Sequence, residues 1–148
     1  MAYTSFRDFC VSAQLAGPEQ FDAWQSDWRR ERTEDGLTDS LPEFLCKRGG
    51  KSEDHFLDCV AEGYDWERID LSDVKPSGEA RRKISSKVAS QHRVVPVSVE
   101  EGVLVVAVSN PFNTDLLNTV RFAAQGPVRF VLASSDDIEK SYEKYYGV

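Results

Sequence analysis

Histidine and cysteine side chains are the ones in this chain best suited to metal binding or nucleophilic chemistry, and their spacing favours neither. His55 and His92 lie far apart, and Cys10, Cys46 and Cys59 contain no Cys-x-x-Cys pair. A structural zinc site needs about four such ligands at short, regular spacing. We therefore predict no metal site, and we expect the cysteines to be reduced, partly buried thiols of a cytoplasmic protein.

Motifs for other chemistry are missing from the sequence as well. It holds neither the Gly-x-Ser-x-Gly turn of serine hydrolases nor the Gly-rich loop with Lys-Ser/Thr that cradles nucleotide phosphates. The adjacent carboxylates Asp136-Asp137 fit the start of a helix, and Glu100-Glu101 fits a solvated turn. We therefore predict a protein that is not an enzyme, with no catalytic residue and no bound cofactor.

Composition and charge limit the partners of the chain. Of its 148 residues 41% are hydrophobic, which is enough to build a core, and no apolar run approaches the roughly 18 residues that cross a bilayer. The N-terminus has no signal-peptide pattern. The net charge is −7, with −9 in residues 1–74 and +2 in residues 75–148. An acidic total argues against nucleic-acid binding, and the contrast between the halves favours two subdomains.

The elements that must position any site begin with a repeat in the first half. Residues 6–21 align with residues 41–56, with Phe9 over Phe44 and Phe21 over Phe56. In each copy the apolar residues fall at i, i+3 and i+4, which places them on one helix face, and a second helix follows a loop. A single helical hairpin cannot bury that face alone, so we expect two hairpins that pack together.

The second half reads as a small α/β unit. Residues 94–97 and 103–108 predict strands joined by a turn at Glu100-Glu101-Gly102, and residues 128–132 predict a third. A helix containing Leu117 and Val120 precedes the third strand and ends at Gly126. A last helix starts after Ser134 or Ser135, and its residues Ile138, Tyr142 and Tyr145, spaced at i, i+4 and i+7, should face the sheet. The predicted fold class is α+β: a helical-hairpin subdomain over 1–74, then an α/β sandwich over 79–148 with about three strands and flanking helices.

Residues 83–147 resemble the N-terminal domain of the type II secretion and type IV pilus assembly ATPases. The family's Val-Leu-Pro-Leu-like strand corresponds to residues 94–97, and its Leu-x-Val-Ala-x-x-Asp-Pro strand and turn corresponds to residues 104–111. Ala133-Ser134 matches the cap of the last helix, and Tyr146-Gly147 matches the closing Tyr-Gly. In the first half, residues 63–71 look like a degenerate form of the family's link between the two parts.

In one branch of that family each hairpin opens with Arg-Leu-Gly, and the pair of hairpins binds cyclic di-GMP. Arginine can pair with phosphate or stack on guanine. Here the openings read Ser5-Phe6-Arg7 and Ser40-Leu41-Pro42, so both arginines and both glycines are missing from the matching positions. Arg7 occupies a glycine position and is the one candidate for nucleotide contact. We therefore expect the hairpins to keep the fold without the cyclic di-GMP site.

The resemblance implies a non-catalytic regulatory and docking domain of a secretion or pilus assembly ATPase. Its expected partner is a cytoplasmic domain of the inner-membrane platform, or an ATPase domain if the chain is part of a longer one. Its expected location is the cytoplasm, with attachment to the inner membrane only through that partner. Two alternatives remain: a cyclic di-GMP sensor with altered hairpins, and a free-standing adaptor with the same fold, which an open reading frame ending at residue 148 would favour.

Overall fold

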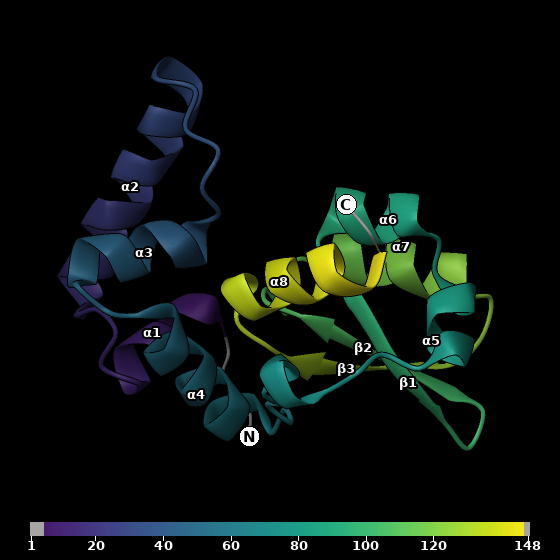
Figure 1. Ribbon diagram of the computed structural model, residues 1–148. Coiled ribbons are helices and arrows are strands. Elements are labelled where there is room, and N and C mark those ends of the chain that lie inside the picture. The colour runs from purple at the N-terminus through teal and green to yellow at the C-terminus, as the bar shows by residue number, and fades with distance from the viewer. Residues whose placement is uncertain (1–4, 147–148) are drawn as a thin grey trace. The chain divides into compact units, whose positions relative to one another are not determined.

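The computed structural model describes residues 5–146, apart from the side chains of residues 73, 145 and 146. Gly147 of the closing Tyr-Gly match, and the side chain of Tyr145, therefore lie outside the described part. The chain divides into two compact units, residues 1–65 and 66–148, coloured purple to dark teal and teal to yellow in Figure 1. The sequence predicts two subdomains, residues 1–74 and 79–148, separated at residues 75–78. These subdomain boundaries remain a prediction.

The first unit consists of two helical hairpins, as the repeat predicts. The first contains α1 (Phe6–Ser12) and α2 (Pro18–Glu34), and the second contains α3 (Leu41–Gly49) and α4 (Glu53–Tyr64). Each helix of the second hairpin thus begins 35 residues after its counterpart in the first. Pro18 stands at the start of α2, where proline's missing N–H costs no hydrogen bond.

Aromatic rings fill the core of the first unit. Phe9 of α1 and Phe21 of α2 are buried, and the ring centre of Phe9 lies 6.4 Å from that of Phe56 and 5.0 Å from that of Tyr64. Trp28 of α2 is half-buried. Its indole N–H needs an acceptor and donates to the backbone carbonyl of Asp39 at 2.8 Å.

One arginine joins the two hairpins. Arg48, near the end of α3, pairs with two carboxylates of α2, Asp27 at 2.9 Å and Glu31 at 3.0 Å. Its guanidinium also lies over the ring of Phe44, 4.6 Å from the ring centre. Beside it, Gly49 allows close approach, because a Cβ there would lie 3.3 Å from the carbonyl oxygen of Leu15.

The second unit is a three-stranded sheet with helices, as the sequence predicts. Strands β1 (Val95–Glu100) and β2 (Val103–Val108) are antiparallel, and β3 (Val128–Leu132) pairs with β2 in parallel. The helices are η1 (Leu71–Asp73), α5 (Gly78–Lys83), α6 (Ser86–His92), α7 (Thr114–Ala124) and α8 (Ser135–Tyr146). The α/β arrangement is visible in Figure 1.

Local signals explain most of these boundaries. The β1–β2 turn consists of Glu101 and Gly102, both at positive φ, as a two-residue hairpin of the right twist requires. Ser85 caps α6, because its side-chain oxygen accepts the backbone N–H of Val88. The end of α7 is a correction: Gln125, with φ 54°, takes the left-handed conformation predicted for Gly126. The helix thus ends one residue before the residue that could adopt this conformation without strain.

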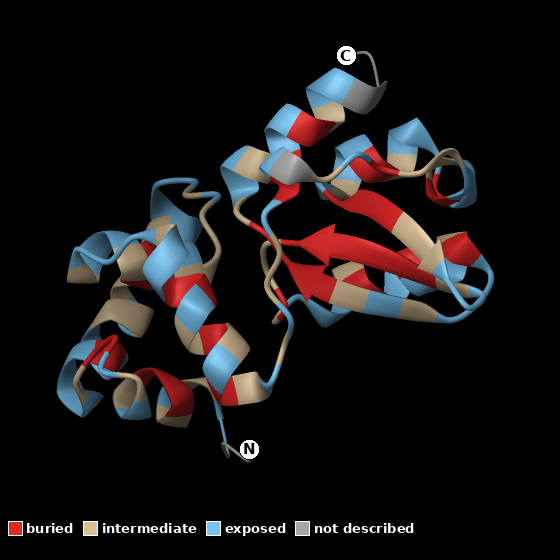
Figure 2. Cartoon of the chain, turned by 60° about the horizontal axis from the view of Figure 1, so that its bottom comes forward, coloured by how far each residue is buried: buried red, intermediate tan, exposed pale blue. Residues whose placement is uncertain are grey.

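Strand β2 is buried on both faces, which explains its unbroken apolar sequence. Leu104, Val106 and Val108 face a cluster that includes residues of α5, α6 and α7. Val105 and Ala107 face a second cluster that includes Leu71 of η1 and residues of α8. The sheet is therefore the middle layer of the unit, and Figure 2 shows the buried residues concentrated along its strands.

The outer edge of β3 is covered by the segment that links the units. The backbone N–H of Ile69 donates to Leu132 at 2.9 Å, and that of Leu132 donates to Glu67 at 2.8 Å. Arg129 of β3 reinforces this edge by pairing with Glu67 and Glu100. The sequence also predicts an extended run over residues 66–71, and the structure confirms its first part: Arg68 forms a parallel bridge with Leu132, whereas Leu71 begins η1.

Candidate functional site

The hairpin openings, where the resemblance places a ligand site, are occupied by helix caps. Ser5 begins α1, and its hydroxyl accepts the backbone N–H of Asp8 at 3.0 Å. Ser40 begins α3 in a capping box: its hydroxyl accepts the N–H of Glu43, whose carboxylate accepts the N–H of Ser40 in return. Arginine has no acceptor atom and could not do this. The serines therefore perform a structural role at the positions of the missing arginines.

Arg7 is engaged within the first hairpin. Its guanidinium binds both carboxylate oxygens of Asp22, with Nε to Oδ1 at 2.9 Å and Nη2 to Oδ2 at 3.2 Å. The hydrogen bond from Arg7 is the main reason that the pKa of Asp22 lies below its usual range. The pair is solvent-exposed, so a phosphate could reach Arg7 but would compete with Asp22 for it. A nucleotide-binding role for Arg7 remains a prediction.

The cysteines and histidines do not assemble into a reactive centre. All three cysteines are free thiols, and burial raises the pKa of Cys10 to about 12 and that of Cys46 to about 11. A raised pKa lowers the fraction of reactive thiolate. Cys59 lies 3.7 Å from His55 Nε2. Across residues 5–146, no group of three or more histidine, cysteine, aspartate or glutamate residues is placed to hold a metal ion.

A groove between α6 and α8, in the second unit, is a candidate cavity for a partner or ligand. We call it the α6–α8 groove. Its volume is about 330 Å³, at the lower end of the range of known ligand pockets, which is roughly 300–1,000 Å³. Side chains from both helices and from the ends of β2 and β3 line it: Ala89, Ser90, Arg93, Ser109, Ser135, Ile138, Glu139, Tyr142 and Glu143.

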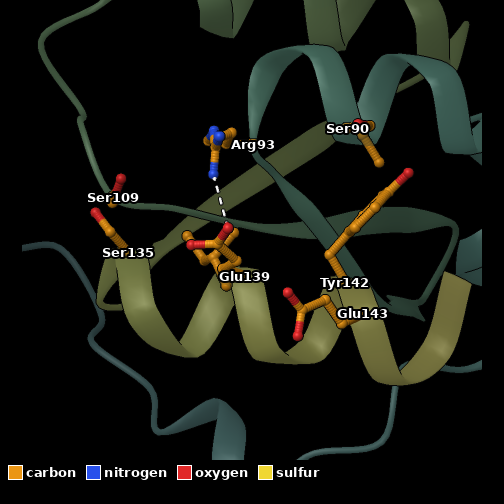
Figure 3. A pocket seen from close by; sticks show the side chains of 9 residues that line it. Ser90, Arg93, Ser109, Ser135, Glu139, Tyr142 and Glu143 are labelled. Atoms are coloured by element: carbon orange, nitrogen blue, oxygen red, sulfur yellow. Dashed lines mark ion pairs between the residues drawn. The ribbon is translucent and has the colours of Figure 1, made fainter. Parts of the chain in front are cut away.

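The fold brings these side chains together at the carboxyl ends of the parallel strands. Ser109 follows β2 and Ser135 follows β3, so the parallel pairing places both hydroxyls at one end of the sheet. Open α/β sheets bind their ligands at this edge. Arg93 ends α6 in the left-handed conformation, with φ 52°. Figure 3 shows these three residues at one side of the groove and Ser90 beside Tyr142 at the other.

Electrostatics divide the groove into two parts. Arg93 Nη1 lies 3.4 Å from Glu139 Oε1, a long and solvent-exposed pair that Figure 3 marks with a dashed line. Glu143 stands one helical turn farther along α8 and has no ion pair among the described residues that line the groove. Tyr142 forms a wall, and its hydroxyl donates to the backbone carbonyl of Ser86 at 3.2 Å. These charged and aromatic side chains can therefore bind and orient a polar or charged group of a ligand or partner.

Sequence reasoning does not reveal this groove. It offers Ser134 or Ser135 as the cap of the last helix and assigns Ile138 and Tyr142 to the packing of that helix, and it gives Arg93 no site role. The structure confirms the packing for Ile138, which is buried, and shows that Ser134 is the residue that caps α8. Ser109, Ser135 and Tyr142 form a site only because α6 meets α8, and no spacing in the sequence indicates that contact.

Comparison with known proteins agrees with this architecture. The profile of the MshEN domain matches residues 64–148. The type IV pilus assembly ATPase PilB of Myxococcus xanthus is 28% identical over 103 residues, which cover 70% of this chain and 18% of PilB. PilB of Acinetobacter baylyi is 27% identical over 78 residues, covering 53% and 14%. The chain thus spans less than a fifth of the length of these curated relatives.

Two solved structures share the fold over nearly the whole chain. MshE with cdg, which is cyclic di-GMP, has a TM-score of 0.79 at 18% identity and covers 97% of this chain and 100% of that one. A structure of the N-terminal domain of XpsE has a TM-score of 0.70 at 24% identity, covering 99% and 100%. At these identities the likeness establishes the fold. The ligand of MshE nevertheless conflicts with our expectation that this fold has lost cyclic di-GMP here.

None of the described helices combines the length and apolar character needed to cross a bilayer. The family profile covers more than half of the residues, from the end of the second hairpin through the sheet. The two assembly ATPases and the two structures agree with it. This chain belongs to the MshEN domain family, found at the N-terminal region of type IV pilus and type II secretion ATPases.

Proposed function

We propose that this chain is a non-catalytic regulatory domain that docks a pilus or secretion assembly ATPase onto the cytoplasmic part of its inner-membrane platform. The α6–α8 groove carries the proposal, because it is a preformed cavity within the matched residues 64–148. Its lining offers serine hydroxyls, a tyrosine, an arginine and two carboxylates, which are groups that can bind a partner. On this proposal the protein works in the cytoplasm and reaches the membrane only through its partner.

Capture by the platform tests the docking proposal. The 148-residue protein is immobilised and presented with purified cytoplasmic domains of platform proteins, and bound protein is quantified. We expect saturable capture that Ser90→Trp abolishes, because Ser90 is an exposed wall residue and tryptophan would fill the groove. Thr119→Trp, at an exposed position of α7 outside the groove, is the matched control and should bind normally. Equal capture by wild type and Ser90→Trp would exclude the groove as the docking site.

ATP hydrolysis tests the non-catalytic part of the proposal. The sequence contains no loop for nucleotide phosphates, so we expect the purified chain to release no phosphate from ATP above the level of a protein-free sample. Turnover that co-purifies with the chain and disappears when the chain is removed by antibody would contradict this proposal.

A cyclic di-GMP sensor is the second candidate, and the likeness to MshE with cdg favours it. Serine caps stand at both of the family's arginine positions, and Arg7 is bound to Asp22, so another part of the first unit could supply the contacts. A hollow of about 460 Å³ beside the turns of the two hairpins offers such groups. Trp24 can stack on a base, and Arg48 and Lys51 can pair with phosphates.

Calorimetric titration with cyclic di-GMP decides on this candidate and locates its site. Micromolar binding that Arg7→Ala removes would place the ligand at the openings. Binding that Lys51→Gln removes would place it in the hollow, and Lys47→Gln, which changes an exposed lysine of α3 outside the hollow, is the matched control. The absence of heat at submillimolar ligand would exclude the sensor function.

A further inference from the structure

The α6–α8 groove carries an imbalance of charge among the described residues that line it. Two carboxylates of α8, Glu139 and Glu143, line it four residues apart, and Arg93 is the only cation among its lining residues. Like charges at this spacing on a helix repel each other. Arg93 lies against Glu139 at 3.4 Å. Lys140, between the two glutamates in sequence, is engaged by Asp136 at 2.8 Å. Glu143 is thus the carboxylate that faces the groove without a cation.

The walls around Glu143 suit a long, partly apolar side chain. Ala89 and Ile138 contribute apolar surface, and the ring of Tyr142 stands beside Glu143 in Figure 3. Ser90 lies on the α6 wall of the groove, across from α8, and its hydroxyl can accept a hydrogen bond. The cavity is small, about 330 Å³, so it accommodates one inserted side chain rather than a helix or a strand.

We propose that the α6–α8 groove receives an arginine side chain presented by the protein partner on which this domain docks. The aliphatic part of the arginine lies along Ala89 and Ile138, its planar guanidinium stacks on Tyr142, and its N–H groups donate to Glu143. Arginine suits the groove better than lysine, because a guanidinium both stacks on rings and pairs with carboxylates through two hydrogen bonds. This inference rests on the proposed docking function and adds the chemistry of the partner.

An anionic anchor fits the same groove poorly. Apart from Arg93, whose guanidinium already lies against Glu139, the groove would oppose it with two carboxylates. A neutral anchor would leave the charge of Glu143 uncompensated. Charge complementarity therefore selects a cation.

The test uses a probe with an isosteric neutral control. N-acetyl-argininamide and N-acetyl-citrullinamide are titrated separately into the ¹⁵N-labelled 148-residue protein, and backbone amide shifts are followed by NMR. We expect saturable shifts confined to α6 and α8 with the arginine probe, and binding at least about fivefold weaker with the citrulline probe. Glu143→Gln should weaken the arginine probe about two- to fivefold, the range measured for solvent-exposed ion pairs. Glu143 is exposed, so this variant should fold.

Asp115→Asn is the matched control, because it also removes one exposed carboxylate but from α7, outside the groove. It should bind the arginine probe as the wild type does. Equal binding of the two probes, shifts outside α6 and α8, or unchanged binding by Glu143→Gln would each overturn the inference. If the arginine probe binds the groove but no platform domain is captured, the inference stands and the docking function fails. If wild type and Glu143→Gln capture a platform domain equally, the docking function stands and the inference fails.

Discussion

Replacing Ser40 by alanine should destabilise the first unit by removing a helix cap. The Ser40 hydroxyl accepts the backbone N–H of Glu43, and the Glu43 carboxylate returns a hydrogen bond to the backbone N–H of Ser40. In Ser40→Ala the backbone N–H of Glu43 loses its acceptor. The Glu43 carboxylate keeps the hydrogen bond from the backbone N–H of residue 40 but loses the one from the Ser40 hydroxyl. Loss of an N-cap side chain costs about 1 kcal/mol of unfolding free energy. Ser5→Ala removes the same kind of cap from α1 and should cost a similar amount.

Urea denaturation followed by circular dichroism measures the effect. In a separate thermal unfolding experiment, the same loss of about 1 kcal/mol lowers the midpoint temperature by roughly 2–4 °C in a chain of this size. Ser26→Ala is the control, because Ser26 is exposed in the interior of α2, where alanine is the better helix former. We expect Ser26→Ala to be neutral or slightly stabilising, while Ser40→Ala loses stability with an unchanged dependence on urea concentration.

The result that refutes this reasoning is a Ser40→Ala protein as stable as Ser26→Ala. The openings would then have no structural need for serine, and the loss of the family's arginines would require another explanation. Ser40→Arg provides a second check, since it introduces the family residue and removes the cap. It should lose at least as much stability as Ser40→Ala, because the guanidinium cannot accept the N–H of Glu43.

Three further predictions concern the core, a strained turn and a buried thiol. Leu57→Ala should cost about 2–5 kcal/mol in urea denaturation, because Leu57 is fully buried in α4. Gln125→Gly should raise the unfolding free energy by about 0.5–1 kcal/mol, because φ at this position is 54° and glycine adopts it without strain; a loss of stability would contradict this. Burial raises the pKa of Cys10 from 9.0 to about 12, so the folded state holds this proton more tightly than the unfolded state does. The resulting stability is fully present below about pH 9 and is lost as the pH rises toward 12, so urea midpoints between pH 9 and 11 should fall more steeply for the wild type than for Cys10→Ala.

Much of the fold could be predicted because its signals are local. The apolar spacing of Phe9 and Phe21 recurs 35 residues later and indicates the hairpins, and the apolar run of β2 indicates a strand buried on both faces. One detail that failed depends on tertiary context. Gln125 takes the left-handed conformation although glycine follows it.

The candidate site could not be predicted because no single segment contains it. Arg93 and Glu139 are far apart in sequence and meet only through the packing of α6 against α8. Ser109 and Ser135 become neighbours only through the parallel pairing of β2 and β3, which depends on where the chain returns after α7. Motif searches detect ligands that one segment supplies, as in a phosphate-binding loop. A groove built from four elements leaves no such pattern.

The two units of this domain illustrate how a family can share a fold while the residues at corresponding positions differ in their roles. At Ser5 and Ser40 the residue that would contact a ligand instead stabilises the start of a helix, so the hairpin is kept by different chemistry at the same position. The guanidinium of Arg7 likewise binds the carboxylate of Asp22 within its own hairpin. The α6–α8 groove has the opposite property: Glu143 is solvent-exposed and has no partner ion among the described residues that line the groove. A carboxylate without a partner ion in the isolated fold is the kind of group through which a domain can contact another protein, and this is why we propose the groove as the recognition surface.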